Sequence, residues 1–346
     1  MSRALVTVLV LVVAACAPQS APTTTAPTTT TTRPPETTTT MAPGDGSVVL
    51  PVASGMGAGW IEAFVIPYGD TPDTLGVSLG GDGEGLLIGP DYGARMSDGT
   101  WWFLDSAKAR LAHFDGEGAY LGEVPMPEEL LVNGEYFQYT LPRGLEDGTL
   151  VAVNANFGGE TSVLRLRDGI IDAVRIPGEW ISRYDDGKLL YAFTFENELL
   201  VVDVDAATAE PTEWFLTRPG ARFGLVVEPG ELRLDLPDVP QEVVIPVEAP
   251  PEIGGTVYVS AEVVSTADGS LHLFLLGLAD ADESIQLAGY LTVGPDGSVS
   301  AVEPVRDPFT EADPGSPSRL GVRPGTDEVS FMFIDPDGVR VFRRAG

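Results

Sequence analysis

The stretch DGTWWFLDSAKARLAHFDGEGAYLGEV, residues Asp98–Val124, contains three short strand patterns separated by polar turns. Thr100–Leu104 is apolar on both faces, which is typical of a strand that lies between neighbouring sheets. Further strands are expected at Ala109–Phe114 and Ala119–Val124, on either side of the turn Asp115–Gly118. A sheet this small cannot fold alone, so the unit is expected to recur along the chain.

Turn markers do recur, at intervals of about 40 to 60 residues, which brackets the length of a four-stranded propeller blade. Each marker precedes an apolar or alternating strand pattern. The six markers are Asp98-Gly99, Asp147-Gly148, Asp186-Gly187, Pro229-Gly230, Asp268-Gly269 and Thr326-Asp327. They predict an all-β, six-bladed β-propeller over residues 47–346, with seven blades as the alternative. Trp60–Pro67 would form the outer strand of the last blade and close the ring, which removes the exposed sheet edges.

The first unit also carries a series of turn and strand residues in a fixed order. They are Gly89-Pro90, Asp98-Gly99, Asp105, Arg110, Phe114-Asp115, Gly118 and Leu121-Gly122. This order resembles an NHL-type propeller repeat, which implies the propeller architecture. The other five units depart from the pattern, so the resemblance implies a fold and no particular activity.

Residues 1–15 have the features of a secretory signal peptide. Arg3 precedes the apolar run Ala4–Ala14, which is too short to span a bilayer as a permanent helix. Val13–Cys16 resembles a bacterial lipobox, and this resemblance implies that Cys16 is lipidated and anchors the protein to the outer face of the bacterial cell membrane. An ordinary cleaved signal peptide is the alternative. Since Cys16 is the single cysteine, no intramolecular disulfide can form.

Residues 16–46 are expected to form a disordered stalk behind this anchor. Twelve threonines and six prolines lie between Ala17 and Pro43, where Met41 is the one large apolar side chain. Such a segment cannot bury enough apolar surface to fold. It would hold the propeller away from the membrane.

The chain is strongly acidic, with 51 acidic and 20 basic residues and a formal net charge of −31. This excess disfavours binding of nucleic acid or of an anionic membrane surface through a basic patch. The expected partners are the membrane, through a lipid on Cys16, and an envelope protein, a peptide or an anionic small molecule. The protein is expected to be a monomer.

Arginines recur where the innermost strand of a blade should run. The five are Arg95, Arg143, Arg183, Arg222 and Arg319. Because inner strands line the channel of a propeller, these residues, with Tyr92 and Tyr184 beside two of them, predict an electropositive channel. Guanidinium groups bind carboxylate or phosphate through two parallel hydrogen bonds, which predicts an anionic ligand. In the alternative, the arginines pair with blade carboxylates such as Asp98 or Asp147 and hold the blades together.

Few residues are candidates for catalysis. His113 and His272 are the only histidines, which excludes a three-histidine metal site. The acidic clusters at 280–283 and 335–338 could offer oxygen ligands to Ca²⁺, but neither has the spacing of an EF-hand loop, and the sequence requires no cofactor. We therefore expect a binding scaffold rather than an enzyme. The alternatives are a hydrolase or lyase that uses acidic residues and a divalent cation, and a structural spacer in the cell envelope.

Overall fold

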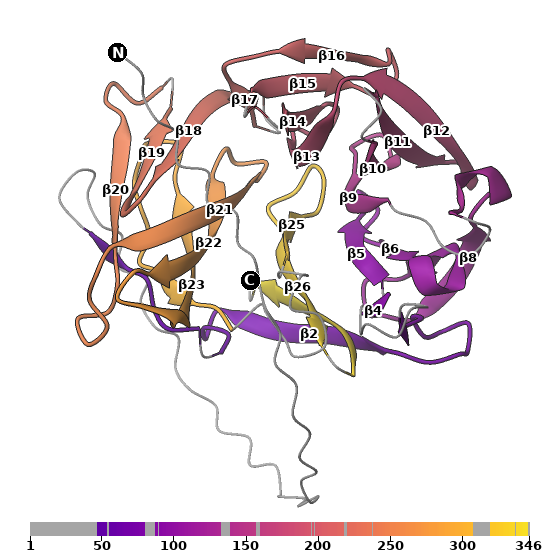
Figure 1. Cartoon of the computed structure of the whole chain (residues 1–346), viewed down its shortest axis with the longest axis horizontal. Helices are drawn as coiled ribbons and strands as arrows, with labels where there is room; N and C mark the ends of the chain where they lie inside the picture. Colours follow the sequence, from indigo (N-terminus) through magenta and orange to yellow (C-terminus); the bar gives the residue numbers. More distant parts are fainter. Residues whose placement is uncertain are drawn as a thin grey trace, which may run out of the picture. The chain divides into compact units, whose positions relative to one another are not determined.

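The structure, a computed structural model, describes residues 47–53, 55–79, 87–88, 90–132, 139–156, 160–194, 196, 198–217, 220–236, 238–306, 319–335 and 337–344. The predictions for the signal peptide, Cys16 and the stalk concern residues outside these ranges. Within them, the chain forms a six-bladed β-propeller, as predicted, and not the seven-bladed alternative (Figure 1). No helix in the described part of the chain has both the length and the apolar character needed to cross a membrane.

The blades are numbered in chain order, and each begins with its strand nearest the axis. Blade 1 consists of β5 (Pro90–Arg95), β6 (Trp101–Asp105), β7 (Arg110–Phe114) and β8 (Tyr120–Pro125). Blade 2 consists of β9 (Thr140–Gly144), β10 (Leu150–Asn156), β11 (Glu160–Arg167) and β12 (Ile170–Pro177). Blade 3 consists of β13 (Trp180–Asp185), β14 (Leu190–Thr194), β15 (Leu199–Asp203) and β16 (Thr208–Pro211).

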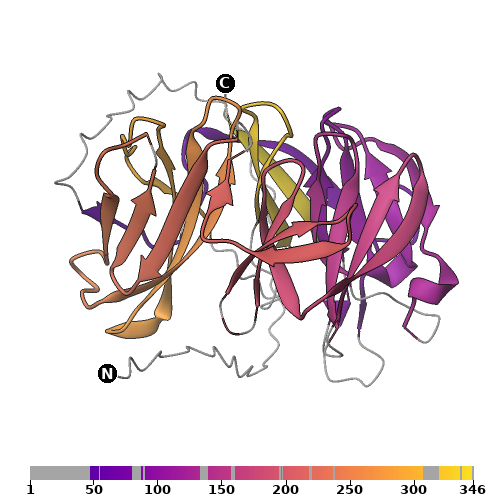
Figure 2. The same cartoon turned by 90° about the horizontal axis from the view of Figure 1, so that it is seen from above.

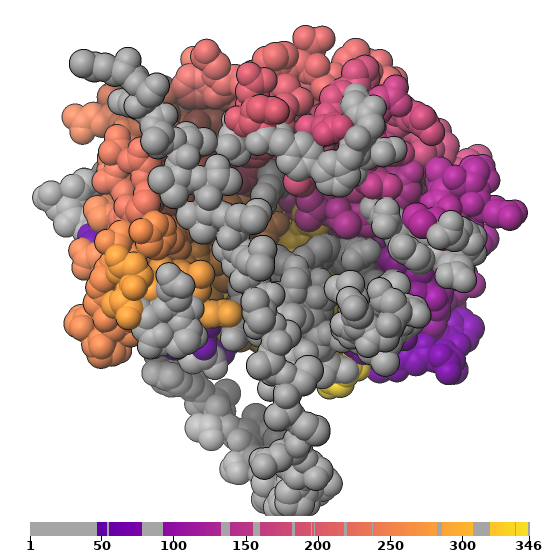
Figure 3. All heavy atoms as spheres, in the orientation of Figure 1, coloured from indigo at the N-terminus to yellow at the C-terminus, as the bar shows by residue number. Residues whose placement is uncertain are grey.

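The remaining blades include strands from the beginning of the described chain. Blade 4 consists of β17 (Phe215–Leu216), β18 (Arg222–Glu228), β19 (Glu231–Asp235), β20 (Val243–Glu248) and the added β1 (Val48–Val49). Blade 5 consists of β21 (Val257–Ser265), β22 (Leu271–Ala279), β23 (Asp282–Val293) and β24 (Glu303–Pro304). Blade 6 consists of β25 (Arg319–Val322), β26 (Val329–Asp335), β27 (Gly338–Arg344) and β2 (Trp60–Pro67). In the space-filling view, the sequence colours of blades 1 to 5 follow one another around the ring (Figure 3).

The turn markers form tight turns between adjacent strands. In blade 1, the Asp98 carboxylate accepts a hydrogen bond from the backbone N–H of Thr100 at 2.9 Å. Gly99 has φ +91°, a left-handed conformation that favours glycine. The carboxylate of Asp115 holds the next turn in the same way, through the N–H groups of Glu117 and Ala119. The three strands predicted in this blade are confirmed, and each predicted end lies within one residue of the observed end.

The two ends of the propeller pair with each other. β2 is antiparallel to β27, with a register from Trp60 opposite Arg344 to Pro67 opposite Gly338. The prediction that Trp60–Pro67 completes the last blade is confirmed.

A belt, residues 47–59 without residue 54, precedes β2 and crosses blades 4 and 5. β1 pairs in parallel with β20. The carbonyl of Pro51 then accepts a hydrogen bond from the N–H of Ala288 at 3.0 Å, and the N–H of Gly57 donates to Pro304 at 2.9 Å. The belt therefore joins the outer parts of two blades before the chain reaches blade 6.

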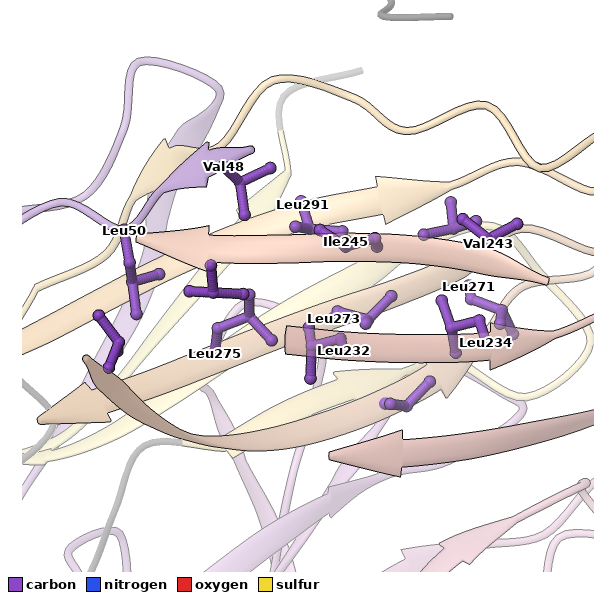
Figure 4. Close-up of a cluster of buried hydrophobic side chains, with 14 of the residues drawn as sticks. Val48, Leu50, Leu232, Leu234, Val243, Ile245, Leu271, Leu273, Leu275 and Leu291 are labelled. Carbon is purple, nitrogen blue, oxygen red and sulfur yellow. The ribbon is translucent and has the colours of Figure 1, made fainter. Parts of the chain in front are cut away.

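Leu50 fixes the belt to the core between blades 4 and 5. Its side chain is fully buried in a cluster that includes leucines and valines of β19, β20 and β22 (Figure 4). Gly277 and Gly289 make room for it, since a Cβ atom at either position would lie within 2.8 Å of a Leu50 methyl group. Two glycines in the middle of apolar strands thus admit one belt side chain.

Leu50→Ala should lower the free energy of unfolding by about 2–5 kcal/mol, because it leaves a cavity between two blades. The matched control is Val49→Ala, where the neighbouring side chain is 45% exposed, and its effect should be under about 0.5 kcal/mol. Urea unfolding of both variants measures the difference. Equal effects would show that the belt does not contribute through Leu50.

Candidate functional site

Three of the five predicted arginines line one cavity at the axis. Arg95 on β5, Arg143 on β9 and Arg319 on β25 are all buried. The cavity has a volume of about 30 Å³, which is space for one or two water molecules. As built, it is too small for an anionic metabolite or a peptide side chain.

Glu262 on β21 lies at the centre of the ion pairs around this cavity. Its Oε1 is 3.6 Å from Arg143 Nη2 and 3.5 Å from Arg319 Nε. Its Oε2 accepts a hydrogen bond from the N–H of Leu320 at 3.0 Å. Arg143 Nε is also 3.8 Å from Asp185 Oδ2 on β13. One carboxylate therefore connects blades 2, 5 and 6.

Arg95 completes the axial group through Glu328, with which it forms an ion pair. Arg323 lies 3.2 Å from the other carboxylate oxygen of Glu328. Burial lowers the pKa of Arg95, and the Glu328 charge acts in the opposite direction. The pair links blade 1 to blade 6.

We call Arg95, Arg143, Arg319, Asp185, Glu262 and Glu328 the axial cluster; it contains three guanidinium and three carboxylate groups, and Glu328 also pairs with Arg323. This pairing corresponds to the alternative in which the arginines hold the blades together. The carboxylates named as examples are engaged elsewhere, because Asp147 pairs with Arg167 at 3.2 Å and Asp98 caps its own turn. Ligand binding by the axial arginines stays a prediction.

The other predicted residues lie in different surroundings. Arg222 is exposed at the first position of β18, 4.7 Å above the Trp214 ring, and is separate from the axial cluster. Arg183 and Tyr92 lie on β13 and β5, but their side chains fall outside the described part of the structure. The Tyr184 hydroxyl donates to the Ala261 carbonyl at 3.3 Å, where blades 3 and 5 meet.

The two histidines lie in separate blades and are held by packing. His113 stacks on Trp102 with ring centroids 4.1 Å apart, and burial lowers its pKa. His272 Nδ1 hydrogen bonds to the hydroxyl of Tyr290, and its Nε2 lies 3.1 Å from Thr266 Oγ1. Burial lowers the pKa of His272 to about 4, so this side chain is neutral at pH 7.

The described residues contain no group of three His, Cys, Asp or Glu side chains that could hold a metal ion. In the two acidic clusters, Asp280 accepts a hydrogen bond from the N–H of Thr256 at 2.8 Å, and Asp335 pairs with Arg340 at 2.9 Å and with Arg306. These acids stabilise turns and strand ends. The side chains of residues 282–285 lie outside the description.

A larger cavity of about 410 Å³ opens between blades 2 and 3, and we call it the blade 2–3 cleft. This volume falls within the range of small-molecule sites. Leu145, Val151 and Val204 are apolar residues of its lining. Its charged lining consists of Arg165, Arg167, Lys188, Glu146, Asp147, Asp203 and Asp205.

Two arginines of β11 share one carboxylate of blade 3 in this cleft. Asp205 Oδ1 lies 3.2 Å from Arg165 Nη1 and 3.3 Å from Arg167 Nη2. Arg165 is held from behind by Asp172, with Nε to Oδ1 at 2.9 Å, and Arg167 Nε donates to Thr149 at 2.8 Å. The guanidinium groups are thus oriented, whereas Asp205 lies on an exposed turn.

The blade 2–3 cleft was not predicted from the sequence, although the sequence of β11 contains a signal for it. Leu164–Arg167 reads Leu-Arg-Leu-Arg, and residues two apart on a strand lie on the same face. Arg165 and Arg167 therefore share one face of the strand, and the buried Leu164 and Leu166 share the other. This pattern lies within four residues, whereas the five arginines predicted at the axis are spread over the blades. Asp205 lies far along the chain, so only the fold brings it to them.

Glu262→Gln should lower the free energy of unfolding by about 2–4 kcal/mol, because it leaves Arg143 and Arg319 buried without this counter-charge. The glutamine retains the acceptor for the N–H of Leu320, so the substitution isolates the charge. Glu242→Gln, an exposed glutamate of blade 4, is the matched control and should cost less than about 0.5 kcal/mol. Thermal or urea unfolding that shows no difference between the two would contradict a structural role for the axial cluster.

Comparison with known proteins places the chain in a family without assigning an activity. Among solved structures, it is similar to a PQQ-bound aldose sugar dehydrogenase from Streptomyces coelicolor, with 12% identity, 84% of this chain and 99% of that chain covered, and a TM-score of 0.43. It is also similar to the propeller domain of the trilobed protease from Pyrococcus furiosus, with 10% identity, coverage of 74% and 82%, and a TM-score of 0.42. These likenesses are too remote to carry an argument about function, and no curated protein matches the sequence. A family model matches residues 58–344, and the chain therefore belongs to the family described as a domain of unknown function, DUF7485.

Proposed function

We propose that this protein is a lipoprotein of the outer cell surface whose propeller binds a small molecule or peptide carrying a carboxylate or phosphate group. The blade 2–3 cleft is the proposed site. One observation carries this proposal: two oriented arginines in a cavity of about 410 Å³ both contact the exposed carboxylate of Asp205.

Asp205 occupies the position that a ligand anion would take. An exposed ion pair contributes little net stability, so exchange of Asp205 for a ligand carboxylate costs little. Arg165 and Arg167 would then bind the anion through charge-assisted hydrogen bonds, and Lys188 would add a third positive charge. Leu145, Val151 and Val204 supply apolar contacts for the carbon skeleton of the ligand.

The acidic surface of the protein does not prevent this binding. At physiological ionic strength, charges separated by more than about 8 Å are largely screened, so the attraction depends on the charges that line the cleft itself, which are three cations and four carboxylates. Three of the eighteen basic residues that follow residue 46 line this one cavity. At the axis, by contrast, the arginines are matched by carboxylates and the cavity holds only water-sized molecules.

The cleft is tested with citrate, inorganic phosphate and a short peptide with a free C-terminal carboxylate as probes. Replacing both Arg165 and Arg167 by alanine should reduce the affinity for the bound probe by at least about tenfold. Asp205→Asn should increase the affinity, because it removes the internal competitor. Calorimetric titration measures both effects.

Arg175→Ala is the matched control for the cleft, since Arg175 lies on the same blade, is highly exposed and is not part of the lining. It should leave the affinity unchanged. If the probe still binds to the double alanine variant but no longer binds to Arg95→Ala, the binding site lies at the axis and not in the blade 2–3 cleft.

Cys16→Ser should release the protein from cells into the medium, because the lipid that the lipobox resemblance implies could no longer be attached. Replacement of Ser20 by alanine, in the stalk, is the control and should leave the protein on the cells. Fractionation with an antibody against the propeller measures both. Retention of the Cys16→Ser protein on cells would refute the lipid anchor without affecting the cleft.

A further inference from the structure

Blade 4 packs one face of its sheet against blade 5 and exposes the other. Leu232 and Leu234 point towards blade 5 (Figure 4), so the side chains that alternate with them point away. On this opposite face, Val226, Arg233 and Val244 are direct neighbours across β18, β19 and β20. Val226 is 50% exposed and Val244 is 39% exposed. Val226 and Val244 therefore lie on either side of Arg233, and this face presents two partly exposed apolar side chains with a charged one between them.

Carboxylates flank these valines. We define the open face of blade 4 as the following residues: Val226, Glu228, Glu231, Arg233, Glu242 and Val244. Arg233 Nε lies 2.5 Å from Glu231, and Arg233 Nη2 lies 3.6 Å from Glu228. The hydrogen bond that Arg233 donates to Glu231, followed by the charges of Glu231, Glu228 and Glu242, raises the pKa of Arg233. Three carboxylates thus surround one guanidinium, and the open face has a net charge of −2.

An aromatic side chain borders the open face at its inner end. The Trp214 ring lies 3.4 Å from the position that a Cβ atom of Gly224 would take, two residues before Val226 on the same face of β18. Arg222 stacks over the outer side of this ring at 4.7 Å. Tryptophan is among the residues that contribute most to protein interfaces.

Blade 3 is the neighbour of blade 4 on the side of the open face. Among the described residues, the aromatic contacts between these two blades involve Phe215 of β17, the strand of blade 4 nearest the axis. The Phe215 ring lies 4.7 Å from Tyr184 and 5.9 Å from both Tyr191 and Phe193. The Tyr184 hydroxyl also donates a hydrogen bond to the Ala261 carbonyl of blade 5, so blades 3 and 5 are in contact with each other nearer the axis than the outer strands of blade 4. In the view turned by 90°, the orange strands of blades 4 and 5 lie at the left and the magenta strands of blade 2 at the right (Figure 2).

We propose that the open face of blade 4 docks a segment of a partner protein in which lysine or arginine alternates with apolar residues. The apolar side chains would cover Val226 and Val244, and the cations would pair with Glu228, Glu231 and Glu242. A second copy of this chain is a poor occupant, because a symmetric contact would bring the same carboxylates together. The net charge of −31 favours encounter with a basic partner over any acidic one.

The test uses a short synthetic peptide in which lysine alternates with valine, and a matched peptide in which glutamate replaces lysine. The lysine peptide should bind the full propeller, and the glutamate peptide should not. In the double variant Glu228→Gln with Glu242→Gln, affinity for the lysine peptide should fall by about tenfold. Fluorescence anisotropy measures the affinity, and amide chemical shifts locate the peptide on β18 to β20.

The matched control is the double variant Glu128→Gln with Glu129→Gln, two exposed glutamates in the short 3-10 helix of blade 1. It removes the same charge and should bind the lysine peptide as the unmodified protein does. Equal losses in the two double variants would show non-specific attraction to net charge and would overturn the proposal. Since all four glutamates are exposed, unfolding midpoints should be unchanged, which separates lost binding from lost folding.

Two other occupants have distinct outcomes. A dimer in sedimentation that dissociates in Val226→Lys would assign the open face to a second copy. Peptide binding that appears only after deletion of residues 17–46 would assign it to the chain's own N-terminal segment. Either result would overturn the proposal, and neither depends on ligand binding in the blade 2–3 cleft.

Discussion

Main-chain pairing between β2 and β27 is the constraint on which the propeller depends. Each blade is a small sheet that buries its faces only against its neighbours, so the ring must close before any blade is complete. The chain meets this requirement with an eight-residue strand taken from before the first blade. It then adds the belt, so that blades 4, 5 and 6 are joined by hydrogen bonds across their outer parts as well as by packing between them.

The axis imposes a second constraint, which concerns charge. Arginines on inner strands are buried when the blades approach one another, and a buried charge is tolerated only when it is paired. Glu262, Glu328 and Asp185 meet this need, so each of the three buried arginines has a carboxylate of another blade beside it. Blades 2 and 3 leave a cleft with charged walls, and Val226 and Val244 of blade 4 are partly exposed on one face of its sheet.

Much of the architecture could be predicted because it is encoded locally. The four Asp-Gly markers have the positive φ angles and the carboxylate acceptors of tight turns. Trp60–Pro67 has a strand pattern without a partner nearby in the sequence. Arg95, Arg143 and Arg319 are buried at the axis because β5, β9 and β25 are the innermost strands of their blades. Arg222 differs because β17, and not β18, is the innermost strand of blade 4, so Arg222 lies on the second strand and is exposed.

What could not be predicted depends on contacts between distant segments. The sequence around Glu262 does not indicate that its carboxylate pairs with Arg143 and Arg319 of other blades. The sequence around Leu50 does not indicate that its side chain packs against two glycines more than two hundred residues away. The charge balance of the axis and the approach of Asp205 to β11 are properties of the closed ring.

The belt also determines the order in which contacts of the propeller would break under a pulling force. In a chain held by its N-terminus, a pulling force enters at Ser47 and reaches β1, where only two residues pair with β20. That contact would yield first, Leu50 next, and the eight-residue pairing of β2 with β27 last. Under such a force, the belt would therefore be released before the ring opened, and its release would expose the core between blades 4 and 5.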